Sequence, residues 1–288
     1  MAFRFKTSDG SVEASLRRIA AEQLDKALAS IEDRDTNNAV HAVRERCKKV
    51  RALLRLVGPA FPAYAEENAF LRDTARLVSR KRDAFVIRET FEALTGEPAP
   101  GADAGTAESA QDVGPLLVQC RQRLLEIRIR SQSWSLDERG WDALSGGFAK
   151  TIRSARKAAR TACETNDPHA YHDLRKQVKY HSFHCQILRP VRPRMLKRRN
   201  RLAAGLAEDL GRHHDLALLT SHLTGSPTDF ITVRRSHEVL LAASGISDGL
   251  ERRANRRARK LLAKRPRIMA KRLGERWKTW ASATEFTG

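Results

Sequence analysis

One pattern of polar residues occurs twice in this chain at a fixed separation. A histidine is followed by an arginine three residues later and by a lysine four residues after that, at His41, Arg44 and Lys48 and again at His172, Arg175 and Lys179. Hydrophobic positions beside the two copies, such as Val43 and Leu174, keep the same offset of 131 residues, and the spacing within each copy is that of one helix face. The pattern predicts two related helical units in tandem.

The rest of the chain is also helical in character. Glycine and proline cluster in few places, and the segments between them have helical hydrophobic periodicity, with no convincing alternating strand. We therefore expect an all-α protein of two pseudo-repeated antiparallel helical bundles. The predicted parts are a first bundle over 1–95, a flexible, low-complexity linker over 96–114 and a second bundle over 115–288. We also predict one continuous helix over 66–94 and two separate helices over 230–243 and 249–264.

Positive charge is the main compositional bias. The 288 residues include 54 Lys and Arg against 34 Asp and Glu, which gives a formal net charge of +20. On the first repeated helix, one arc of about 80° beside the apolar face carries His41, Arg44, Lys48, Arg51 and Arg55. The second copy keeps the first three positions, but Ser182 and Gln186 replace the last two cations. The cations therefore border the core, where neighbouring helices would enclose them in a basic groove or channel.

Such a surface needs an anionic partner, because like charges that lie close together repel one another. Sites for single-stranded nucleic acid usually interleave aromatic and basic side chains, but aromatic residues make up only 6% of this chain and none lies between His41 and Arg55. We also find no recognisable duplex-reading motif. The composition favours a ligand made of phosphate alone, and an RNA-binding or DNA-binding protein is the alternative.

The repeated segments resemble the CHAD family, the conserved histidine α-helical domain. The resemblance rests on Val40–Arg44 with the cations that follow, on His172–Lys176 with Lys179, and on the aligned segments Ser79–Asp83 and Leu210–Asp215. It implies two related helical bundles that bind inorganic polyphosphate and target the protein to polyphosphate granules. The acidic Glu-x-Glu-x-Lys strand of the module that often accompanies this domain is absent, so the resemblance implies a binding protein and not an enzyme.

We expect the basic and histidine side chains on these helical faces to contact polyphosphate. The predicted binding residues are His41, Arg44, Lys48, Arg51, Arg55, Arg72, Arg76, Arg153, Lys157, Arg160, His172, Arg175, Lys179, Arg252 and Arg256. We predict no catalytic residue and no cofactor.

A metal site is a weaker hypothesis. Four histidines lie between His169 and His184, and His213, His214 and Asp215 follow downstream, all of which are plausible ligand types. His181, however, aligns with the core residue Val50, so we predict no metal site. A metal-dependent phosphatase acting on polyphosphate is the remaining enzymatic alternative.

Other sequence signals concern location. The four cysteines lie far apart without a Cys-x-x-Cys pair, which predicts neither a disulfide framework nor a zinc knuckle and indicates a reduced, cytosolic location. No apolar run approaches the length of about 18 to 20 residues that a transmembrane helix needs. The first ten residues also lack the apolar core of a signal peptide. We therefore expect no membrane partner.

Overall fold

A computed structural model of the chain describes residues 3–32, 36–99, 113–225, 233–284 and 286. These residues form helices joined by short turns and contain no strand, so the protein is all-α, as predicted. The α-helices are α1 (Val12–Ile31), α2 (Thr36–Val57), α3 (Tyr64–Leu77), α4 (Ser79–Thr95), α6 (Gly114–Arg130), α7 (Asp142–Thr165), α8 (Pro168–Ile187), α9 (Pro193–Gly225), α11 (Val233–Leu262) and α12 (Pro266–Ser282).

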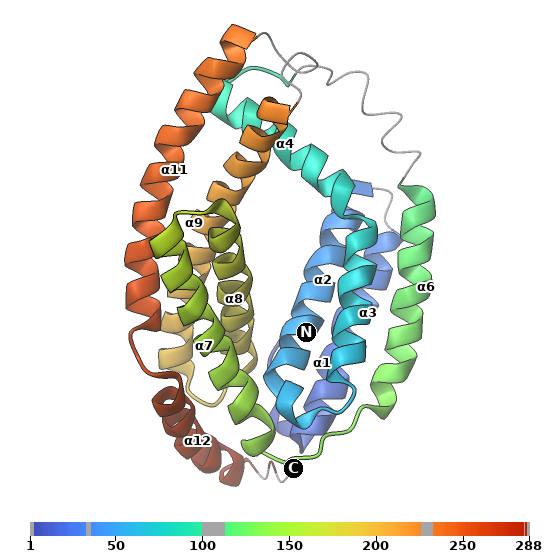
Figure 1. The fold of residues 1–288 in the computed structure, drawn as a ribbon. Coiled ribbons are helices and arrows are strands. Elements are labelled where there is room, and N and C mark those ends of the chain that lie inside the picture. The colour runs from blue at the N-terminus through green and yellow to red at the C-terminus, as the bar shows by residue number, and fades with distance from the viewer. Residues whose placement is uncertain (1–2, 33–35, 100–112, 226–232, 285, 287–288) are drawn as a thin grey trace.

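The helices form two groups that lie side by side (Figure 1). One group contains α1, α2, α3 and α6, the other contains α7, α8, α9 and α11, and α4 crosses from the first group to pack against α9. The order of helices is the same in both groups: at the offset of the sequence repeat, α1 corresponds to α7, α2 to α8, α3 with α4 to α9, and α6 to the later part of α11. A tandem repeat predicts this correspondence, and we keep the repeat as a proposal.

The predicted bundle boundaries differ from the packing. Helix α6 packs against α1 and α3, although the sequence analysis assigned it to the second bundle. Residues 100–112 of the predicted linker lie outside the described residues, and the flanking Ala99 and Val113 are both buried. One buried cluster runs from Leu16 in α1 to Leu273 in α12 through both groups of helices. The two groups therefore share a hydrophobic core.

The helix predicted over 66–94 is wrong as a single element, because the chain bends at Val78 between α3 and α4. Val78 has φ/ψ angles of −102° and 12°, outside the α-helical range. The Ser79 hydroxyl donates to the Ala75 carbonyl at 2.9 Å, and the Arg44 guanidinium also donates to this carbonyl, at 3.4 Å. These side chains compete for the carbonyl that a continuous helix would pair with a backbone N–H. Hydrophobic periodicity could not predict this break, because it does not report hydrogen bonds made by polar side chains.

The two helices predicted over 230–243 and 249–264 form one helix, α11, from Val233 onward. Glycine in a helix interior costs about 1 kcal/mol relative to alanine, and Gly245 lies between the two predicted helices while Gly249 begins the second. Buried Ala243 and Leu250 lie on either side of these glycines, and α11 packs along α9. Tertiary packing therefore offsets the low helix propensity of this segment.

The two groups of helices meet where α7 crosses the carboxyl end of α2. A Cβ atom at Gly147 in α7 would lie 2.6 Å from the carbonyl carbon of Leu56 and nearer still to the carbonyl oxygens of Arg55 and Leu56. Only glycine allows two helices to approach this closely. Helix α8 also contacts α2, since Nε2 of His184 donates to the Ala52 carbonyl at 2.8 Å. The two repeated helices, α2 and α8, are therefore held against each other.

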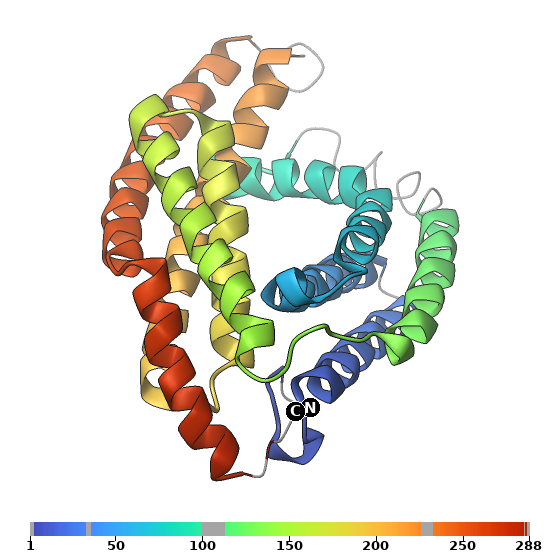
Figure 2. The same ribbon diagram turned by 60° about the horizontal axis from the view of Figure 1, so that its bottom comes forward.

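Helix α12 packs against the start of α7 through aromatic side chains. A Cβ atom at Gly274 would lie 2.5 Å from Cδ1 of Trp141, so the indole occupies the space that a larger side chain would need. The ring of Trp277 lies 5.9 Å from that of Trp141 and 5.8 Å from that of Phe5. Helix α12 lies beside α7 (Figure 2), and the ring of Phe5 lies 6.3 Å from that of Phe286. These contacts fix α12 relative to α7.

We predict that Gly147→Ala lowers the free energy of unfolding by about 1–3 kcal/mol or more, because the added methyl group meets backbone atoms that cannot move aside. The matched control is Gly245→Ala, an exposed glycine of α11 whose added Cβ would have no atom within 4 Å. This control should gain about 0.5–1 kcal/mol. Urea denaturation measures both changes, and equal stability of Gly147→Ala and the native chain would contradict the close helix crossing.

Candidate functional site

A cavity of about 420 Å³ opens between α8 and α9. Its charged lining residues are Arg175, Lys179, Glu208, Arg212 and Asp215. Gly211 forms part of its wall, and a Cβ atom there would lie 3.6 Å from the guanidinium of Arg175. Arg175 of α8 therefore lies against α9 at Gly211. The two repeated cations of α8 that the sequence predicted, Arg175 and Lys179, are therefore brought into one cavity.

Two histidines from different helices stack close to Arg175. The ring centroids of His172 in α8 and His214 in α9 are 4.2 Å apart, with 38° between the ring planes. Burial, reinforced by the charges of Lys176 and Arg175, lowers the pKa of His172 to about 4. Burial, reinforced by His172 and Arg175, lowers the pKa of His214 to about 3. Both rings are therefore neutral at neutral pH.

Helix α2 adds positive charge beside the histidine pair. Lys48 is close enough to the histidine pair to depress the pKa of both His172 and His214. Partial burial and the charges of its neighbours, including Lys49 of α2, lower the pKa of Lys179. Cations of α2 and α8 therefore act on each other across the boundary between the two groups of helices. We define the anion site as Lys48, His172, Arg175, Lys179 and His214.

Arg44 and Arg175 occupy corresponding positions in the two halves. Arg44 donates to the Ser79 hydroxyl at the start of α4, and Arg175 lies against Gly211 of α9. In sequence, Ser79 and Gly211 are equivalent positions of the two third helices. Each repeated arginine thus contacts the equivalent position of the third helix in its own half. The helix break at Val78 leaves this relation intact.

Ion pairs behind the anion site hold α9 against α11. The buried carboxylate of Asp209 accepts from Arg257 at 2.5 Å and from Arg253 at 3.4 Å. Nε2 of His213 lies 2.9 Å from Oε1 of Glu251 on α11. Since His213 is followed directly by His214, this contact also fixes the segment that carries one of the stacked rings. These groups position the site without lining its cavity.

The last two cations of the first stripe make contacts between helices. The Nε of Arg51 donates to an asparagine side chain of α3 at 3.0 Å. The guanidinium of Arg55 lies 4.3 Å from the ring centroid of Tyr180 on α8, within range of a cation–π interaction. In the second copy, the Ser182 hydroxyl donates to Oδ1 of Asn200 on α9 at 2.8 Å. These positions therefore join helices together in both halves.

Three further predicted residues lie near carboxylates on the surfaces of α2 and α3. Asp73 accepts from the Nε of Arg72 at 2.9 Å and from Arg76 at 3.4 Å. The exposed ring of His41 lies 3.8 Å from Oε2 of Glu45. None of the three predicted residues lines the cavity between α8 and α9.

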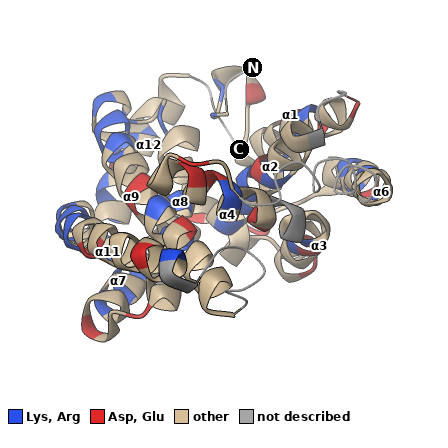
Figure 3. Cartoon of the chain, turned by 90° about the horizontal axis from the view of Figure 1, so that it is seen from above, with Lys and Arg blue, Asp and Glu red and all other residues tan. Residues whose placement is uncertain are grey.

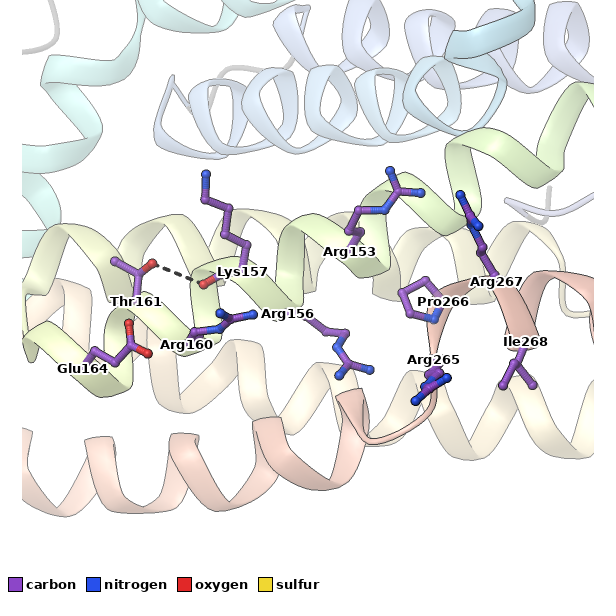
Figure 4. Close-up of a pocket in the computed structure, with 10 residues that line it drawn as sticks. All are labelled: Arg153, Arg156, Lys157, Arg160, Thr161, Glu164, Arg265, Pro266, Arg267 and Ile268. Atoms are coloured by element: carbon purple, nitrogen blue, oxygen red, sulfur yellow. Dashed lines mark hydrogen bonds between the residues drawn. The ribbon is translucent and has the colours of Figure 1, made fainter.

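The predicted residues of α7 line a second and larger cavity. Arg153, Lys157 and Arg160 border a space of about 1030 Å³ (Figure 4). This cavity shares no lining residue with the one between α8 and α9. Arg252 and Arg256 are exposed on α11 and line neither cavity. The predicted cations are thus divided between separate places, and a single continuous groove or channel stays a prediction.

Overall charge does not single out a site. Lys and Arg occur on helices all around the molecule and are interspersed with Asp and Glu (Figure 3). The anion site differs from these surfaces because three helices, α2, α8 and α9, bring cations and two stacked imidazoles together in a partly buried space.

Comparison with known protein families gives a match over most of the chain. A family model described as the CHAD domain matches residues 18–224, which include both repeated helices and both third helices. The chain belongs to the CHAD domain family. A search of curated proteins finds no match. The match ends before α11 and α12, so these two helices lie beyond the matched part of the CHAD domain.

Some site residues of this CHAD domain were not selected from its sequence. His214 and Asp215 were considered as metal ligands, and with Arg212 they belong to a segment aligned with Arg82 and Asp83, but none of the three was predicted to bind polyphosphate. That alignment was the available signal, because it places His214 where the first copy has a cation. The side chain of Arg82 lies outside the described residues, so its relation to His41 is not compared.

The described part of the structure contains no cluster of side chains that supports the metal hypothesis. Within the described residues, no group of three or more His, Cys, Asp or Glu side chains is arranged to hold a metal ion. His181 and His184 are buried in the core, where Nε2 of His181 accepts from Arg199 at 2.9 Å and His184 donates to a backbone carbonyl. All four cysteines are free thiols, of which only Cys163 is exposed.

The structure also bears on the membrane prediction. Among the residues it describes, no helix has both the length and the apolar character needed to cross a membrane.

We predict that acid destabilises the CHAD domain between about pH 6.5 and about pH 4. Burial lowers the pKa values of His172 and His184 to about 4 and that of His214 to about 3, from an ordinary value of 6.5. In this pH window the unfolded chain binds more protons than the folded chain, so the free energy of unfolding falls as the pH falls. Above pH 6.5 these groups add no pH dependence. Urea denaturation at a series of pH values measures the slope.

The variant His172→Asn tests the origin of this slope. It removes one of the depressed groups, so the number of protons taken up on unfolding should fall by about one near pH 5. The control is His237→Asn, an exposed histidine of α11. Equal slopes for His172→Asn and the native chain would show that His172 does not contribute to acid unfolding.

Proposed function

We propose that the protein binds inorganic polyphosphate non-covalently at the anion site and does not hydrolyse it. The observation that carries this proposal is the convergence of Lys48, Arg175 and Lys179 beside two stacked imidazoles. Membership of the CHAD domain family, which is linked to polyphosphate binding in general, supports the same ligand.

The electrostatics of the site favour a ligand with many negative charges. Close cations repel one another, and the lowered pKa values of Lys179, His172 and His214 reflect this positive surrounding together with burial. A phosphate chain would neutralise several of these groups at once. It would also supply an acceptor for Nδ1 of His172, which is buried and makes no hydrogen bond within the described residues. Arginine and lysine are suited to phosphate oxygens, the former through paired N–H donors.

The small amount of accessible aromatic surface at this site favours polyphosphate over nucleic acid. Phe183 lines the cavity between α8 and α9 but is only 8% exposed, and Tyr180 is buried with Arg55 covering its ring. Bases would find no stacking platform there. In a competition assay with chains of matched charge, polyphosphate should displace RNA. The reverse order of affinity would support the alternative of an RNA-binding or DNA-binding protein.

A metal-dependent phosphatase is the second alternative, because Asp215 lies in the same cavity as the cations. It predicts phosphate release from polyphosphate with added divalent metal, and loss of that release in Asp215→Asn. A binding protein would release no phosphate under the same conditions. We further propose that the protein acts in the cytosol and is targeted to polyphosphate granules by this binding.

We predict that replacing two cations of the anion site weakens polyphosphate binding and reduces its dependence on salt. The variant is Lys48→Gln with Lys179→Gln, two exposed side chains whose removal should preserve the fold. Each lost phosphate contact should lower the slope of log affinity against log salt by about 0.7–1, because fewer condensed counterions are released. Affinity should fall by roughly tenfold or more at low salt. Titration calorimetry at several salt concentrations measures both quantities.

The matched control is Arg121→Gln with Arg139→Gln, which removes the same charge from two exposed side chains that line neither cavity. This control should change affinity little. If both double variants weakened binding equally, net charge and not the anion site would be responsible.

We also predict that polyphosphate binding tightens as the pH falls from about 7 to about 5. Bound phosphates should raise the pKa values of His172 and His214 from their low starting values of about 4 and about 3. The complex then takes up protons that the free protein does not hold, and lower pH favours it. Calorimetry in buffers of different ionisation enthalpy measures the protons taken up. An uptake of zero near pH 5 would contradict contact between the histidine pair and the ligand.

A further inference from the structure

Six of the ten residues that line the cavity beside α7 are cations. Four come from α7 and two from the start of α12: Arg153, Arg156, Lys157, Arg160, Arg265 and Arg267. Glu164 is the one carboxylate among the lining residues, and the apolar lining is limited to Pro266 and Ile268. In Figure 4, Arg156 and Arg265 approach from the two helices, while Lys157 and Arg153 extend from the other side of α7. The excess of cations over carboxylates is larger here than around the cavity between α8 and α9.

These six cations lack the carboxylates that accompany many other arginines of the molecule. All six are exposed, and within the described part of the chain none of them forms an ion pair. By contrast, Glu67 pairs with Arg130, and Asp209 pairs with Arg257. Six like charges around one cavity repel one another, so an anion bound there would relieve that repulsion.

The relative position of the two helices is fixed by the core. Trp141 at the start of α7 packs against Gly274 and Trp277 of α12. Arg156 also donates to the carbonyl of Lys264, directly before α12, at 3.3 Å. Because this packing holds the backbones in place, the cations are brought together by the fold and not by mobile termini.

We propose that this cleft, which we call the outer cleft, is a second site for a segment of the same polyphosphate chain. This inference rests on the proposed function, since it assigns the same ligand. The cations Arg153, Lys157 and Arg160 follow one another along α7 for about 10 Å, at 1.5 Å rise per residue, which suits a linear anion. The lining contains no aromatic residue for a nucleotide base to stack on. The two arginines of α12 lie beyond the part of the chain that matches the family model.

Two sites on one protein have a consequence for chain length. A long chain that occupies both sites gains affinity because the second contact is made within the same complex. Tripolyphosphate is too short to gain in this way and should bind the two sites separately. The outer cleft therefore predicts a preference for long chains.

The test compares three forms of the full chain by titration calorimetry with tripolyphosphate and with long-chain polyphosphate. They are the native protein, the outer-cleft variant Arg160→Gln with Arg265→Gln, and the control Arg121→Gln with Arg139→Gln, whose side chains are also exposed. The native protein and the control should bind two tripolyphosphates, and the outer-cleft variant should bind one. For long chains, the outer-cleft variant should lose roughly tenfold or more in affinity while the control loses little.

The variant Lys48→Gln with Lys179→Gln separates this inference from the proposed function. If it weakens one tripolyphosphate site and leaves the other, both proposals hold. If the outer-cleft variant binds tripolyphosphate and long chains as the native protein does, the outer cleft is not a site, although the proposed function survives. If the native protein binds neither ligand, the proposed function fails. Tighter binding of ATP than of tripolyphosphate at the outer cleft would overturn the assignment of a phosphate chain.

Discussion

Helices α2 and α8 carry like charges and nevertheless lie against each other, and the remaining architecture depends on this contact. The close approach of Gly147 to the carboxyl end of α2 and the hydrogen bond from His184 to the Ala52 carbonyl hold the two helices in a shared core. Nonpolar burial on this scale outweighs the repulsion between exposed cations, which water and salt screen. The consequence is that Lys48 of one half acts on the histidines of the other.

Arginines have two different roles in this molecule, and the side chain that each arginine contacts determines which role it has. On α11, Arg253 and Arg257 bind the buried carboxylate of Asp209 and join helices, whereas Arg252 and Arg256, one position earlier in each case, are exposed. A shift of one residue turns a side chain by about 100° around the helix. Net charge therefore overstates the charge available to a ligand, and the cavities show where it is concentrated.

The all-α class and most helix positions follow from hydrophobic spacing and from glycine and proline. The repeated signature also led to Arg175 and Lys179, which share a cavity, because a helical face is determined by sequence alone. The break at Val78 did not follow, since it depends on side chains that compete for the Ala75 carbonyl. The contacts of Arg51 and Arg55 did not follow from the sequence either, because their partners come from other helices. Nor did the place of Arg265, which lies about a hundred residues along the chain from the α7 cations with which it lines a cavity.

The buried contact between Arg199 and His181 has a further implication. Nε2 of His181 accepts from the guanidinium of Arg199 at 2.9 Å, and Arg199 also donates to the Leu261 carbonyl at 3.0 Å. Burial and the charge of Arg199 hold the pKa of His181 well below its ordinary value. A carboxylate in this position would merely lose attraction in acid, but a protonated imidazole would repel the arginine. Protonation of His181 therefore opposes the packing of α8 against α9 that forms the walls of their cavity, whereas the arginines and the lysine that line this cavity keep their charge in acid.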